Sequence, residues 1–166
     1  MIILGIDPGT ASIGYGILES LGTISRRGVK TRRVRCIDYG LIKTYPETPF
    51  PERLVIIGKE INALIKKHRP ELIAIESVFF FRNLKTFIPV SRASGVIILS
   101  AAKNKIPVVE FTPLQVKARV ANYGRAEKKE VQRRIVQILK LKEIPKPDDV
   151  ADALGVALCG IFSLPS

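Results

Sequence analysis

The chain of 166 residues is long enough to bury a sizeable core, and we expect one domain spanning residues 1–166. Its 27 Lys and Arg against 15 Asp and Glu give a formal charge of +12, which favours nucleic acid as a partner over an ordinary basic enzyme. Cys36, Cys159 and the single His68 have no zinc-binding spacing, which excludes a zinc site and fits free thiols. No apolar run is long enough to span a bilayer, so we expect a cytoplasmic protein with no membrane segment.

The N-terminal half predicts three strands, a helix and a fourth strand. Apolar and turn patterns give their limits as strands at 1–7, 12–18 and 34–45, a helix at 54–68, and a strand at 71–77. The first strand ends at Asp7, just before Pro8-Gly9, and the fourth ends near Glu76. Both carboxylates thus stand at the ends of apolar runs, where charged side chains are not expected.

The polar segment between the second and third strands is strongly basic. Its end, the hairpin 25–35, carries basic residues with no acid between them, namely Arg26, Arg27, Lys30, Arg32, Arg33 and Arg35. The hairpin is either a solvated tip or a DNA contact, and the sequence leaves both readings open.

The C-terminal half predicts helices around one short strand. Their limits are a helix at 84–104 that is irregular at Pro89, a strand at 108–111, and helices at 113–122, 126–140 and 148–163. The order predicts an α/β fold, a five-stranded mixed sheet with helices on both faces. A right-handed crossover would set the fourth strand beside the first, bringing Asp7 and Glu76 together at the carboxyl edge of the sheet.

Four carboxylates predict a metal site. Asp149 and Asp152 are three residues apart on one helix, so both project from the same face. Alone, each acid could belong to a turn, a cap or a helix start, but four acids gathered together repel one another unless cations neutralise them. All-oxygen ligands select Mg²⁺, with Mn²⁺ able to substitute, and two such ions can clamp the oxygens of a phosphodiester displacement.

Several short motifs in a fixed order resemble the RuvC family of bacterial Holliday-junction resolvases, over about residues 2–162. They are Ile3-Leu4-Gly5-Ile6-Asp7-Pro8-Gly9, Ala74-Ile75-Glu76 with Val78-Phe79, Gln115-Val116-Lys117, Ala126-Glu127-Lys128, and Asp149-Val150-Ala151-Asp152-Ala153-Leu154.

The resemblance implies a ribonuclease H-like fold and a homodimer that nicks four-way DNA junctions symmetrically with magnesium, alongside the RuvA and RuvB branch-migration proteins. The family's metal ligands fall on Asp7, Glu76, Asp149 and Asp152, with Asp148 as the alternative to Asp149. Its lysines near the scissile phosphate fall on Lys117 and Lys128. Its junction-contacting aromatic falls on Phe79, and the DNA contacts predicted after it are Arg82 and Asn83, in a segment that departs from the commoner family sequence.

The remaining basic residues and the apolar helix fit the same function. From 115 to 147 there are ten Lys or Arg and three Glu, which predicts salt-sensitive phosphate binding, although a solvated helix with ion pairs would look similar. The apolar segment 88–102 is the expected dimer interface, with burial against the sheet as the alternative.

Three other functions compete with the resolvase. Asp7-Pro8-Gly9-Thr10 also fits a sugar-kinase or actin-like ATPase, but the chain has no second glycine-rich phosphate loop. A YqgF-type ribosomal-RNA-processing nuclease shares the fold, but the lysine stretch and the aromatics after Glu76 disfavour it. A non-enzymatic nucleic-acid binder would have no use for the full acidic set.

Overall fold

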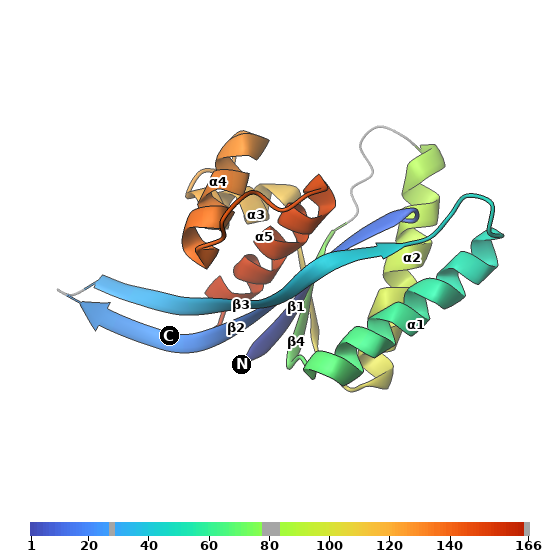
Figure 1. Ribbon diagram of the computed structural model, residues 1–166, viewed down its shortest axis with the longest axis horizontal. Coiled ribbons are helices and arrows are strands. Elements are labelled where there is room, and N and C mark those ends of the chain that lie inside the picture. Colours follow the sequence, from blue (N-terminus) through green and yellow to red (C-terminus); the bar gives the residue numbers. More distant parts are fainter. Residues whose placement is uncertain (27–28, 78–83, 165–166) are drawn as a thin grey trace.

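A computed structural model describes residues 1–26, 29–77 and 84–164, and it contains one five-stranded sheet with the strand order β3-β2-β1-β4-β5 (Figure 1). The strands are β1 (Ile2–Asp7), β2 (Ser12–Arg26), β3 (Val29–Lys43), β4 (Leu72–Glu76) and β5 (Val108–Phe111). The central strand β1 runs antiparallel to β2 and parallel to β4, and β4 runs parallel to β5. The predicted mixed sheet, with the fourth strand beside the first, is confirmed.

Helices cover both faces of the sheet, as expected from the sequence. They are α1 (Phe50–His68), α2 (Leu84–Lys103), α3 (Pro113–Ala121), α4 (Lys128–Leu139) and α5 (Asp148–Phe162). One core cluster packs the sheet against α1 and α2, and a second packs it against α3, α4 and α5. Pro89 lies inside α2 without ending it. Across the described ranges, no helix combines the length and the apolar character that crossing a membrane requires.

Two glycines let α5 lie directly on the sheet. A Cβ atom at Gly14 of β2 would stand 1.9 Å from the backbone oxygen of Asp149, and one at Gly5 of β1 would stand 2.4 Å from that of Ala153. Real Cβ atoms never come so close, so only glycine permits this approach. The helix is buried almost throughout, and its first turn is thereby fixed beside the carboxyl end of β1.

The hairpin of β2 and β3 is longer than the sequence suggests. Residues 19–33 were expected to be a polar connection, but the two strands continue through most of it, pairing Glu19 with Arg35 and Arg26 with Val29. The outer part of this hairpin extends beyond the core. Its strands therefore need no alternation of apolar and polar residues, and the sequence shows no strand periodicity there. Register shifts between Ser20 and Thr23, with Gly22 at a φ of 88°, interrupt the pattern further.

Candidate active site

Three elements bring the four predicted metal ligands to one edge of the sheet. Asp7 ends β1 and Glu76 ends β4, and these parallel strands are neighbours with Ile6 paired to Ile75. The two carboxylates therefore leave the sheet side by side. Asp149 and Asp152 come from the first turns of α5, which the glycine contacts hold against the sheet.

Asp7 and Glu76 form a closely coupled pair of carboxyl groups joined by a hydrogen bond. Burial, reinforced by the charges of Glu76, Asp152 and Asp149, raises the pKa of Asp7 to about 8. Burial and the charge of Asp152 also raise the pKa of Glu76. Protonation would relieve the repulsion between the two groups, and a divalent cation held by them would compete with that proton.

Asp149 is held by a residue that the sequence analysis missed. The Ser12 hydroxyl, at the start of β2, donates a hydrogen bond to Oδ2 of Asp149. Ser12 follows the turn after Asp7, so one short segment carries a predicted ligand and orients another. Serine in a turn gives no specific signal, and only Gly14 and Gly16 in the following strand hint at a helix packed closely here.

Asp152 and Asp148 share Lys128. The Lys128 Nζ lies 2.9 Å from Oδ2 of Asp152 and 3.1 Å from Oδ2 of Asp148. Asp148 Oδ1 also accepts a hydrogen bond of 3.1 Å from the buried amide of Gln132, and the bonds from Lys128 and Gln132 lower the pKa of Asp148. Partial burial alone would lower the pKa of Lys128, but its bonds to Asp152 and Asp148 raise it. The adjacent acids 148 and 149 therefore face different partners.

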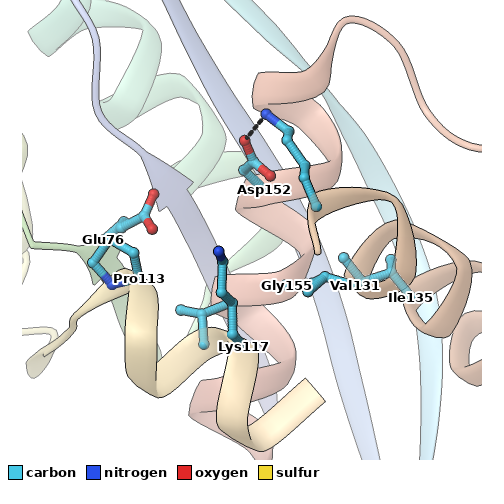
Figure 2. A pocket seen from close by; sticks show the side chains of 9 residues that line it. Glu76, Pro113, Lys117, Val131, Ile135, Asp152 and Gly155 are labelled. Carbon is cyan, nitrogen blue, oxygen red and sulfur yellow. Dashed lines mark hydrogen bonds and ion pairs between the residues drawn. The ribbon is translucent and has the colours of Figure 1, made fainter. Parts of the chain in front are cut away.

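A small pocket lies beside the carboxylates. Its volume is about 200 Å³, and Glu76, Lys117, Lys128 and Asp152 line it together with an apolar floor of Pro113, Val116, Val131, Ile135 and Gly155. Figure 2 shows the side chains of Glu76 from β4, Lys117 from α3 and Asp152 from α5 directed toward the same space. The charge of Lys117 acts to lower the pKa of Glu76. Both predicted lysines therefore stand at the acidic cluster.

Three predicted DNA contacts cannot be compared with the structure. Phe79, Arg82 and Asn83 lie outside the described residues. They follow Glu76 in the chain, and their roles stay predictions from the resemblance.

The four carboxylates suit a hard divalent cation, although their side chains are not arranged as a complete metal site. Within residues 1–26, 29–77 and 84–164, no three Asp, Glu, His or Cys side chains stand close enough to form a ready metal cluster. The charges of Glu76, Asp152 and Asp149 nevertheless add to burial in raising the pKa of Asp7, so the other three carboxylates lie within electrostatic reach of Asp7. Carboxylate oxygens without a thiolate or imidazole fit Mg²⁺ or Mn²⁺.

Comparison with known proteins gives one consistent family. The family model described as crossover junction endodeoxyribonuclease RuvC matches residues 3–160. The chain is 48% identical over 164 residues to the protein of that name from Desulfitobacterium hafniense, covering 99% of this chain and 94% of the relative. It is also 48% identical over 159 residues to the protein of that name from Pelotomaculum thermopropionicum, covering 96% and 92%.

Solved structures agree with this assignment. The chain matches the Thermus thermophilus RuvC structure with a TM-score of 0.88 and 34% identity, covering 98% of this chain and 94% of that one. It matches T. thermophilus RuvC in complex with a Holliday junction substrate with a TM-score of 0.85, 32% identity and the same coverage. These matches confirm the ribonuclease H-like fold. The chain therefore belongs to the RuvC family of crossover junction endodeoxyribonucleases, metal-dependent enzymes that resolve Holliday junctions.

Proposed function

We propose that the chain cuts four-way DNA junctions with two Mg²⁺ ions held by Asp7, Glu76, Asp149 and Asp152, with Mn²⁺ able to substitute. The observation that carries this proposal is the convergence of four carboxylates from β1, β4 and α5. Burial, reinforced there by the charges of Glu76, Asp152 and Asp149, raises the pKa of Asp7 to about 8. Two ions would supply an activated water and stabilise the charge on the departing 3′ oxygen. Asp7, at the end of the central strand β1, would be one of the ligands that hold them.

The chain's own residues would orient the phosphate and the ligands. Lys117 and Lys128 line the pocket with Glu76 and Asp152, so their ammonium groups would contact the non-bridging oxygens of the scissile phosphate. Lys128 would have to exchange part of its bonding to Asp152 for the phosphate, while Asp148 kept it in place. Ser12 would hold Asp149 in its ligating orientation.

We assign the ligand role to Asp149 and a positioning role to Asp148. Asp149 is half-buried and its charge acts on Asp7, whereas the exposed Asp148 is bonded to Lys128 and Gln132. Because the residues are consecutive on α5, their side chains diverge by roughly 100° around the helix. Only one of the two can face the ligands on β1 and β4.

A homodimer would present two equivalent sites to the two strands that are cut. On α2, Ala93 and Ile97 are fully buried in the core, while Ile88 and Leu99 are about half exposed. The exposed side forms a stripe of Ile88, Gly95 and Leu99 that is interrupted by Arg92, with open space around Gly95. This stripe supports the expected interface. RuvA and RuvB as partners rest on the resemblance alone. The cytoplasm as the location rests on the free thiols and the short apolar runs of the sequence.

The decisive assay incubates the protein with a synthetic four-way junction or a matched linear duplex, with and without Mg²⁺. We expect symmetric nicks only in the junction and only with the metal. Asp7→Asn should abolish nicking while the protein still binds the junction, because the phosphate-binding lysines remain. Nicking by Asp7→Asn at the wild-type rate, or equal cutting of the linear duplex, would reject the proposal.

Variants of Asp149 and Asp148 in the same assay show which of the two is the metal ligand and which is the positioning residue. Asp149→Asn should abolish nicking, whereas Asp148→Asn should slow it by no more than about 10–100-fold, as for residues that orient a reacting group. The concentration of Mg²⁺ needed for half-maximal nicking should stay unchanged in Asp148→Asn. If Asp148→Asn is the inactive variant instead, the two roles are exchanged.

A further inference from the structure

The outer part of the β2–β3 hairpin, residues 20–26 and 29–34, is here called the β2–β3 ribbon, and it extends away from the active site. Pairing with β1 ends at Glu19 of β2, and beyond that point β2 and β3 pair only with each other as far as Arg26 and Val29. Ser12, at the start of β2, lies beside the carboxylates. With a rise of about 3.3 Å per residue, the end of the ribbon lies up to about 45 Å from Ser12. Figure 1 shows it projecting past the helices, at the opposite end of the molecule from the start of α2.

The charge of the ribbon has a single sign. Between Glu19 and Asp38 the chain has six basic residues and no acid. At the base of the ribbon Arg35 forms an ion pair with Glu19 across the two strands, and Arg32 donates a hydrogen bond to the Leu164 carbonyl. Arg33 is exposed, and Arg26 and Lys30 lie farther out along the paired strands. Such a surface attracts a polyanion.

Helix α4 joins the active site to the ribbon. It begins at Lys128, which contacts Asp152, and its far end packs into the core cluster that also includes Val34 and Cys36 of β3. Its 12 residues span about 18 Å. Lys129, Arg133 and Arg134 are exposed along this length, with Lys140 just past its end, and they outnumber the one exposed acid of the helix, Glu130. Positive charge therefore continues from the active-site lysines along α4 to the ribbon.

We propose that the ribbon and α4 bind the phosphate backbone of one duplex arm of the junction, well beyond the cleaved position. This inference rests on the proposed function, because it needs junction DNA in the active site. The ribbon begins where β2 stops pairing with β1, about 23 Å from Ser12. A duplex arm that runs along it would cover this distance with about 7 base pairs at 3.4 Å each. The end of the ribbon corresponds to about 13 base pairs. Arms shorter than about 7 base pairs would therefore not reach it.

The test compares Lys30→Ala/Arg33→Ala with wild type on two junctions, one with arms of about 20 base pairs and one with loop-closed arms of about 6. The salt dependence of the dissociation constant is measured for each. On the long arms, the slope of log Kd against log salt should fall by about 2, one for each lost phosphate contact. On the short arms the slope should not change.

Two further variants control for charge and folding. Lys59→Ala/Lys66→Ala removes two exposed charges from α1, on the other face of the sheet, and should leave both slopes unchanged. Lys30→Arg/Arg33→Lys keeps the charge and should keep the wild-type slope.

The outcomes separate this inference from the proposed function. If wild type nicks neither junction, the proposed function fails. If wild type nicks both, but Lys30→Ala/Arg33→Ala keeps the wild-type slope on long arms, the inference alone fails, and the ribbon serves another partner such as an acidic protein surface. An equal loss on short and long arms, or the same loss in Lys59→Ala/Lys66→Ala, would also overturn it.

Discussion

Asp7 is the residue on which the electrostatics of the site depend. Its pKa is raised from 3.8 to about 8, so without metal it stabilises the fold fully below pH 3.8 and loses that contribution as the pH rises through 8. In Asp7→Asn the side chain at position 7 cannot ionise, so the variant does not lose this stability as the pH rises. In chelator, we expect Asp7→Asn to gain at least about 1 kcal/mol over wild type between pH 5 and pH 9, or roughly 2–4 °C in Tm.

Thermal unfolding of both proteins across this pH range measures the effect. Glu143→Gln, an exposed acid-to-amide change after α4, is the matched control and should follow wild type at every pH. A Tm difference between Asp7→Asn and wild type that stays constant from pH 5 to pH 9 would show that burial and the neighbouring carboxylates do not raise the pKa of Asp7.

Helix α2 exposes large apolar side chains that a second copy of the chain could bury. Leu99 is 53% exposed in the last third of α2, on the side opposite the residues that pack into the core. In a twofold dimer, Leu99→Asp would place like charges near each other and cost several kcal/mol. We expect the dimer to weaken by more than about 100-fold, as measured by analytical ultracentrifugation. Leu114→Asp, at a site 62% exposed on α3, is the control and should remain dimeric. A wild-type monomer at micromolar concentration, or a dimer of Leu99→Asp, would contradict the interface.

Elements differ in how well the sequence predicts them. The strands ending at Asp7 and Glu76 are buried on both faces, so their apolar runs identify them, and crossover handedness makes them neighbours. The outer ribbon has no such signal, because strands held only by cross-strand hydrogen bonds tolerate polar residues on both faces. Ser12 and Gln132 act through tertiary contacts with Asp149 and Asp148, and local pattern does not encode such contacts.

At the scale of the whole molecule, the four predicted ligands and the exposed basic residues of α4 and the ribbon occupy different places. The carboxylates gather where β1, β4 and α5 meet, while the basic residues continue along α4 to the ribbon. Attraction for a polyanion and retention of divalent cations can thus coexist in a chain of charge +12. Such a division suits a nuclease, because the long-range field draws DNA in and the local acidic cluster determines where it is cut.

The most direct test of the central claim is a crystal of the protein soaked in Mn²⁺, with data collected at the manganese absorption edge. The account predicts two anomalous peaks about 3.5–4 Å apart, with Asp7 touching both and Glu76, Asp149 and Asp152 completing the ligands. Peaks that avoid these four carboxylates, or no peak beside Asp7 at saturating Mn²⁺ and a pH above 8, would contradict it.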